Sequence, residues 1–129
     1  MDLGLTDKVA VVTGSSRGLG LASGRALVAE GCRVCLCARG EERLAEAALE
    51  VEAAAKRPNL VATVQADVST RDGVERVIEK AVDTFGGIDV LVAQHADRVW
   101  RSSLEQQLFF SQVKGTDLTL VATPRRDTA

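Results

Sequence analysis

The sequence lacks the features that mark a membrane protein or a nucleic-acid-binding protein. Its formal net charge is only −2, from 16 basic and 18 acidic residues, so no broad basic surface is expected. No apolar run approaches the roughly 20 residues of a membrane span. The first residues, Met1-Asp2-Leu3-Gly4, lack the basic and apolar regions of a signal peptide. These absences favour a cytoplasmic location, and the length of 129 residues favours one small domain.

Histidine is almost absent, and cysteine is confined to one stretch. The only histidine, His95, lies far along the chain from Cys32, Cys35 and Cys37. A closed zinc site usually needs four ligands, so no metal site is expected here. Residues 33–38 are typical of a buried strand, in which cysteine behaves as a small apolar side chain. The sequence therefore predicts that the cysteines pack in the core, with redox chemistry as the remaining alternative.

A glycine-rich loop is the most informative feature that is present. It reads Thr13-Gly14-Ser15-Ser16-Arg17-Gly18-Leu19-Gly20, between an apolar run and a helical pattern. Such a loop points backbone N–H groups and the positive end of the next helix at one spot, which binds phosphate. The Lys-Ser or Lys-Thr pair of a Walker A loop is absent. We expect a pyrophosphate to bind here; the alternative is a Gly/Ser-rich turn without a ligand. The residues expected to surround it are Gly14, Ser16, Arg17, Gly18, Leu19 and Gly20.

The pattern from residue 8 to residue 92 alternates between strand and helix. Strands are predicted at residues 9–13, 33–38, 60–66 and 88–92. The third helix has the clearest bounds, with Ser69 and Asp72 as a predicted capping pair and Gly86-Gly87 at its end. Helices between strands imply right-handed crossovers and a parallel sheet. The expected fold class is α/β: an incomplete three-layer, Rossmann-like parallel sheet of strand order 3-2-1-4, with helices on both faces and an irregular C-terminal tail.

Three motifs give the sequence a resemblance to the short-chain dehydrogenase/reductase family. They are the G-x-x-x-G-x-G spacing behind Thr13, Ala66-Asp67-Val68 at the end of the third predicted strand, and the approach to the fourth strand at residues 85–92. The resemblance covers residues 5–92. It implies that Asp67 accepts a hydrogen bond from the adenine amine and that the chain at Val68 wraps the adenine ring. It also implies hydride transfer between a nicotinamide and a carbonyl or alcohol in the full-length family.

The end of the second predicted strand bears on which nicotinamide cofactor binds. Proteins that prefer NAD usually place Asp or Glu there, bonded to the ribose hydroxyls. This chain has Cys37-Ala38-Arg39 instead. A carboxylate would repel the 2′-phosphate of NADP, whereas an arginine pairs with it through charge-assisted hydrogen bonds. We therefore expect NADP(H) rather than NAD(H), with Arg17 as a second cation. The alternative for Arg39 is an ordinary solvated loop arginine.

The motifs of the family stop at Val92. Where the family has N-N-A-G, this chain has Ala93-Gln94-His95-Ala96. The family's proton donor is a tyrosine, with a lysine four residues later, and this chain contains no tyrosine. General acid catalysis worth about 10²–10⁴-fold is therefore missing. Imidazole titrates near neutrality, so His95 could replace the tyrosine in principle, but it has no identified partner. No catalytic residue is therefore assigned.

The sequence divides at the same point. Residues 1–92 are expected to form an NAD(P)-binding half-domain, and residues 93–129 a divergent tail with a helix at about 98–113 and a short strand at about 117–122. The abrupt change predicts a truncated or frame-shifted gene product. The expected function is the NADP(H)-binding domain of an oxidoreductase of this family, inactive as this chain. The alternatives are a nucleotide-binding module without chemistry and a fragment that self-associates through an open edge at the fourth strand.

Overall fold

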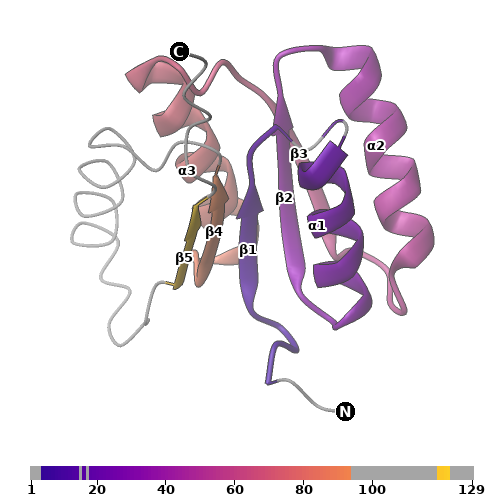
Figure 1. The fold of residues 1–129 in the computed structure, drawn as a ribbon. Helices are drawn as coiled ribbons and strands as arrows, with labels where there is room; N and C mark the ends of the chain where they lie inside the picture. Colours follow the sequence, from indigo (N-terminus) through magenta and orange to yellow (C-terminus); the bar gives the residue numbers. More distant parts are fainter. Residues whose placement is uncertain (1–3, 15, 17, 94–118, 123–129) are drawn as a thin grey trace.

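The architecture is a parallel sheet with helices on both faces. The computed structural model describes residues 4–14, 16, 18–93 and 119–122 (Figure 1). In chain order the elements are β1 (Val9–Val12), α1 (Gly18–Ala29), β2 (Arg33–Ala38), α2 (Glu41–Ala54), β3 (Val61–Gln65), α3 (Arg71–Phe85), β4 (Val90–Ala93) and β5 (Thr119–Ala122). Among these residues, no helix is both long enough and apolar enough to cross a bilayer.

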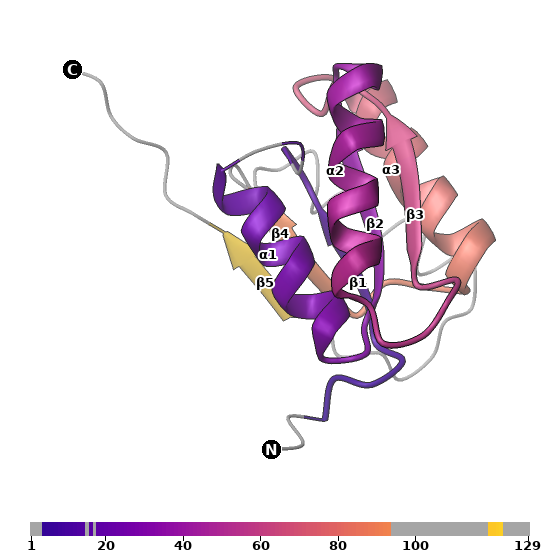
Figure 2. The ribbon, with the colours of Figure 1, turned by 90° about the vertical axis from the view of Figure 1, so that its right-hand side faces the viewer.

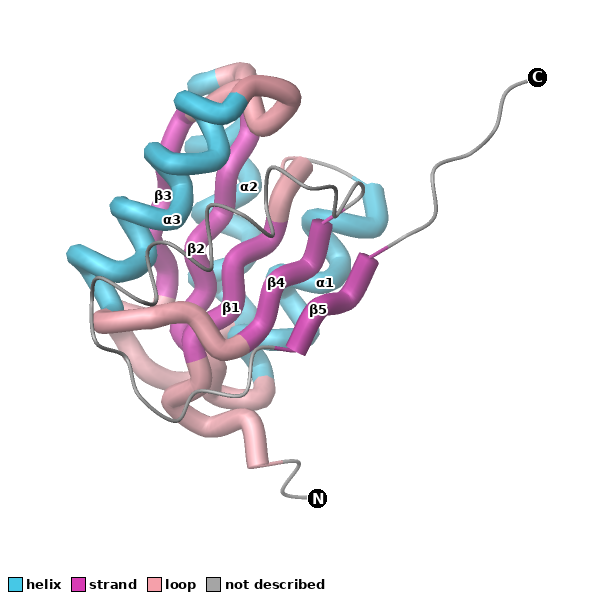
Figure 3. The backbone as a smooth tube through the Cα atoms, turned by 90° about the vertical axis from the view of Figure 1, so that its left-hand side faces the viewer, coloured by secondary structure: helices cyan, strands magenta, loops and turns pink. Residues whose placement is uncertain are grey.

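The strands lie in the order β3-β2-β1-β4-β5, and every neighbouring pair is parallel (Figure 3). The predicted order 3-2-1-4 is therefore confirmed. The predicted open edge at the fourth strand is wrong, because β5 pairs with β4 from Val90↔Thr119 to Ala93↔Ala122. This short strand of β-branched and apolar residues occupies the backbone hydrogen-bonding groups that would otherwise be exposed along β4.

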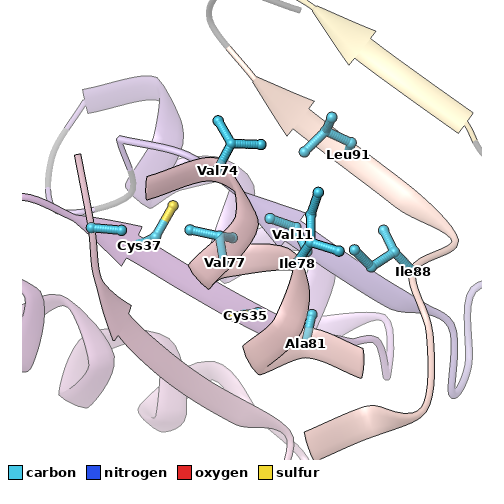
Figure 4. Close-up of a cluster of buried hydrophobic side chains, with 10 residues drawn as sticks. Val11, Cys35, Cys37, Val74, Val77, Ile78, Ala81, Ile88 and Leu91 are labelled. Atoms are coloured by element: carbon cyan, nitrogen blue, oxygen red, sulfur yellow. The ribbon is translucent and has the colours of Figure 1, made fainter. Parts of the chain in front are cut away.

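Among the described residues, two helices cover one face of the sheet and one covers the other. Figure 2 shows α1 and α2 in front of the strands and α3 behind them. Along β2 the side chains alternate between the two faces, as the pleat of a strand requires. Val34 and Leu36 belong to the core under α1 and α2. Cys35 and Cys37 belong to the core under α3, together with Val77 and its neighbours (Figure 4).

The predicted core packing of the cysteines is confirmed. Cys32, Cys35 and Cys37 are all buried, and none of them forms a disulfide. Burial raises the pKa of the Cys35 thiol to about 11 and that of the Cys37 thiol to about 12. The thiolate is the nucleophilic form of cysteine, so these neutral thiols are unsuited to redox chemistry.

The start of α3 differs from the sequence-based prediction. The residue that caps it is Thr70, whose hydroxyl oxygen accepts a hydrogen bond from the Gly73 N–H at 3.0 Å. Ser69 does not take this role because its hydroxyl donates to the Asp67 carboxylate at 2.6 Å. The predicted end of the helix is confirmed, since Gly86 adopts a left-handed conformation with φ 88° and donates its N–H to the Val82 carbonyl at 2.8 Å.

Candidate functional site

The glycine-rich loop begins at the end of β1, and hydrogen bonds join this strand to the chain of β4. The Thr13 N–H donates to the Val92 carbonyl at 2.9 Å, which joins the end of β1 to β4. At the opposite end of the same strands, the Val9 N–H donates to the Asp89 carboxylate and the Asp89 N–H donates to the Val9 carbonyl, both at 2.8 Å. The path of β1 into the loop is therefore fixed at both ends.

Two glycines give the loop its turn. Gly14 and Gly18 have φ values of 58° and 60°, in the left-handed region that side chains other than asparagine and aspartate rarely adopt. A Cβ atom at either position would meet nothing within 4 Å. The requirement for glycine at these two positions is therefore one of backbone conformation, and the space outside the loop is open.

The third glycine brings the helix against the loop. A Cβ atom at Gly20 would overlap the Gly14 carbonyl oxygen and lie 3.0 Å from the Thr13 carbonyl oxygen. Only a residue without a side chain permits this approach. One turn further along α1, Gly24 lies under Leu36 of the sheet and Val51 of α2, where a Cβ would lie 3.1 and 3.5 Å from their methyl groups. The glycines thus seat α1 closely on the end of β1.

The N-terminus of α1 supplies hydrogen-bond donors. The first N–H groups of a helix have no acceptor within the helix, and they carry its positive dipole end. The first turn of α1 contains no acidic side chain that would neutralise it. Leu19 is 61% exposed, and Ser16 is half-buried. Beneath the loop, the buried Cys37 thiol donates a hydrogen bond to the Val12 carbonyl at 3.5 Å.

A second group of predicted site residues lies where β3 ends. Asp67 is exposed, and its carboxylate accepts hydrogen bonds from the Ser69 N–H at 3.0 Å and from the Ser69 hydroxyl. These bonds, with a smaller contribution from the charge of Arg39, lower the pKa of Asp67 below its ordinary value. Asp67 is thus a fixed, ionised acceptor at the end of the strand. The following Val68 is half-buried and packs against the core under α3.

Hydrogen bonds also hold the backbone of the turn that begins at Asp67. The Asp67 carbonyl accepts hydrogen bonds from the Thr70 N–H at 3.2 Å and the Thr70 hydroxyl at 2.9 Å. A Cβ atom at Gly73 would overlap the same carbonyl. Ser69, Thr70 and Gly73 were not among the predicted site residues. The run of small and hydroxyl residues after Asp67 was the signal, since such residues bond the backbone locally in turns.

Arg39 lies beside this turn. It is exposed and follows β2 directly, and its positive charge makes a small contribution to the lowered pKa of Asp67. The backbone N–H of Ala66 donates to the Ala38 carbonyl at 3.1 Å, and Gln65 Nε2 donates to the Arg39 carbonyl at 2.9 Å. The fold therefore brings Arg39 and Asp67, 28 positions apart in the chain, to neighbouring strand ends. The loop at the end of β1 lies at the same edge of the sheet (Figure 1).

Some predicted features lie outside the described residues. They are Arg17 of the loop, His95, and the helix expected at about 98–113. The strand expected at about 117–122 corresponds to β5. Within the described part of the chain, no group of three or more His, Cys, Asp or Glu side chains is arranged to hold a metal ion.

The family model for short chain dehydrogenases matches residues 8–108, which is further than the motifs up to Val92 reach. An uncharacterized oxidoreductase of Staphylococcus saprophyticus is 41% identical over 88 residues, which cover 68% of this chain and 37% of that protein. An uncharacterized oxidoreductase of Mycobacterium bovis is 42% identical over 115 residues, which cover 84% of this chain and 43% of that protein. The chain thus spans less than half the length of these relatives.

Solved structures show the same likeness. A short chain dehydrogenase/reductase from Burkholderia phymatum in complex with NAD is 30% identical, with a TM-score of 0.63 over 68% of this chain and 30% of that one. The L-sorbose reductase from Gluconobacter frateurii, complexed with NADPH and L-sorbose, is 32% identical, with a TM-score of 0.71 over 86% of this chain and 49% of that one. With a closely packed glycine loop, the 3-2-1-4 sheet order and a family match over most of its length, the chain belongs to the short-chain dehydrogenase/reductase family.

Proposed function

We propose that this chain is the NADP(H)-binding part of an oxidoreductase of the short-chain dehydrogenase/reductase family. The observation that carries the proposal is the close approach of Gly20 to the carbonyl oxygens of Thr13 and Gly14, because it sets the N-terminus of α1 beside the loop. A diphosphate at this position would accept hydrogen bonds from the first turn of the helix. The family relatives in complex with NAD and with NADPH support a nicotinamide dinucleotide as the ligand.

In this proposal, different residues bind the diphosphate and the adenine of the ligand. Ser16, Arg17, Gly18 and Leu19 surround the diphosphate together with Gly14 and Gly20. The Asp67 carboxylate, held by Ser69, accepts a hydrogen bond from the adenine amine, and Val68 lies against the adenine ring. All these residues fall within residues 1–92, the cofactor-binding half in this proposal. No binding residue is assigned to residues 93–129.

The preference for NADP(H) over NAD(H) rests on Arg39. The residue that ends β2 is Ala38, so no carboxylate is present at that strand end to bond the ribose hydroxyls or to repel a 2′-phosphate. In this proposal, the exposed guanidinium of Arg39 binds a 2′-phosphate that lies where β2 and β3 end. A hydrogen bond to a charged group contributes about 1.5–3 kcal/mol, which corresponds to a preference of about ten-fold or more.

The chemistry of the bound cofactor would be hydride transfer to or from a carbonyl or alcohol. The 129 residues contain no tyrosine, so the proton donor of the family is missing from them. We therefore propose that this chain by itself holds the cofactor without turning it over. The proposal includes a cytoplasmic location, which fractionation of cells that express the protein would test.

The experiment that tests the function follows nicotinamide fluorescence while the purified chain is titrated with NADPH and with NADH. Saturable binding that is tighter for NADPH supports the proposal. Oxidation of NADPH in the presence of a panel of aldehydes and ketones would contradict the proposed inactivity. A folded chain that binds neither nucleotide would contradict the function itself.

A further inference from the structure

Arg39 follows the last backbone hydrogen bond between β2 and β3. Ala38 is in register with Gln65, and the Ala66 N–H donates to the Ala38 carbonyl at 3.1 Å. Beyond this bond the two chains separate. The chain after β2 enters α2 at Glu41, while the chain after β3 turns at Asp67. The Arg39 carbonyl therefore lies where the backbone ladder has ended.

A side chain continues the ladder by one step. Gln65 Nε2 donates a hydrogen bond to the Arg39 carbonyl at 2.9 Å. This bond fixes the orientation of the peptide group between Arg39 and Gly40. On its other side, the Gly40 carbonyl accepts the Leu44 N–H at 3.1 Å, which begins α2. Arg39 is thus held between a bond from β3 and the first turn of α2.

The residue that follows Arg39 adds little restraint of its own. Gly40 is conformationally permissive, and it caps α2 without a side-chain hydrogen bond. An arginine side chain also loses considerable rotamer entropy when a ligand fixes it. When the backbone of Arg39 is already anchored, less conformational entropy is lost on binding of the ligand.

We propose that Gln65 is a positioning residue that directs Arg39 toward the 2′-phosphate of NADP(H) and so contributes to the choice between the two cofactors. The inference rests on the proposed function. Gln65 carries no charge, and its side-chain amide donates a hydrogen bond to the backbone of Arg39 rather than to a ligand. Its effect is therefore expected only on ligands that carry a 2′-phosphate and only while the Arg39 side chain is present.

The test uses the full chain and two probes, 2′,5′-ADP and 5′-ADP, which differ in the 2′-phosphate. Gln65→Met keeps the length of the side chain and removes the donor. We expect it to weaken binding of 2′,5′-ADP by about 3- to 10-fold, the value of one hydrogen bond, while 5′-ADP binds within about two-fold of wild type. If Gln65→Met does not fold, Gln65→Thr provides a strand-compatible side chain too short to reach the carbonyl.

Two further variants separate positioning from a general structural role. Thr63→Val changes another exposed position of β3, two residues from Gln65, and should leave both affinities unchanged. In an Arg39→Ala background, Gln65→Met should have no further effect on 2′,5′-ADP. Equal weakening of both probes, or an undiminished effect without the Arg39 side chain, would overturn the inference.

The outcomes also separate the inference from the proposed function. If wild type prefers 2′,5′-ADP and Gln65→Met leaves that preference intact, the inference fails and the proposed function stands. If wild type binds neither probe, or binds both equally, the proposed function fails at the first titration, and the inference fails with it.

Discussion

A Cβ atom at Gly20 would overlap the carbonyl oxygen of Gly14. These two residues belong to different elements, the first turn of α1 and the loop that leaves β1. In the proposed function, their approach makes this strand-to-helix connection a diphosphate site, because it sets the donors of the helix beside the loop.

Gly20→Ala should therefore separate α1 from the loop. Overpacking of this kind costs typically about 1–3 kcal/mol of the free energy of unfolding. We expect a lower denaturation midpoint and loss of NADP+ binding under conditions where the variant is still folded. Gly40→Ala is the matched control, because a Cβ there meets nothing within 4 Å and Gly40 has a φ of −90°. Equal stability of the Gly20 and Gly40 variants would contradict the packing described here.

The effect of a substitution at Gly18 on stability should depend on the backbone conformation that the new residue allows, rather than on its size. Its φ of 60° disfavours alanine by about 1–2 kcal/mol, whereas asparagine enters the left-handed region more readily. Gly18→Ala should therefore lower the free energy of unfolding more than Gly18→Asn, as measured by chemical denaturation. The reverse order of the two variants would show that φ does not govern this position.

Ser69 and Thr70 should have separate effects although they are adjacent. Thr70→Ala removes the cap of α3 and should cost about 1 kcal/mol of the free energy of unfolding. Ser69→Ala removes the hydroxyl bond to Asp67, so the pKa of Asp67 should rise toward its ordinary value, as followed by an NMR titration. A Ser69 variant with an unchanged Asp67 pKa would contradict the network.

The Asp67 network also implies a pH dependence. The pKa of Asp67 is lowered in the folded chain, so its contribution to stability is present above the unfolded-state pKa and is lost as the pH falls through the folded-state pKa. Wild type should therefore lose more stability on acidification from neutral pH than Ser69→Ala does. Parallel pH profiles of stability for the two proteins would contradict a stabilising role of the bond from Ser69 to Asp67.

The cysteines should be inert in the folded chain. All three are buried, and the pKa values of Cys35 and Cys37 are raised to about 11 and 12. Iodoacetamide at neutral pH should therefore leave them unmodified in native protein and alkylate all three in denaturant, as counted by intact mass. Rapid labelling of native protein would contradict their burial.

Sequence patterns were sufficient to predict the sheet order, whereas the remaining features depended on individual hydrogen bonds and on a strand pairing that the patterns do not reveal. The alternation of strand and helix patterns, which implies right-handed crossovers, predicted the order 3-2-1-4. The cap of α3 was misassigned because Ser69 and Thr70 are both hydroxyl residues, and the bond from Ser69 to Asp67 decides between them. The open edge at β4 was wrong because its partner, β5, begins at Thr119, 26 positions beyond the end of β4. Gln65 was overlooked because its partner is the backbone carbonyl of Arg39, which follows another strand.

Arg39→Asp should abolish the preference for NADP(H). The new carboxylate would repel a 2′-phosphate and could bond the ribose hydroxyls of NAD, so NADP+ should bind at least about ten-fold more weakly while NAD+ binds no more weakly than before. Equilibrium titration with both nucleotides measures the two effects. An unchanged ratio of affinities would show that Arg39 is a solvated loop residue.

The most direct measurement of the central claim is a calorimetric titration of the wild-type chain with NADP+ and NAD+, repeated with Gly20→Ala. The account predicts saturable binding of NADP+, about ten-fold or more tighter than that of NAD+, and no binding by the variant. A folded wild-type chain that binds neither nucleotide, or a Gly20→Ala chain that binds NADP+ as well as wild type, would contradict it.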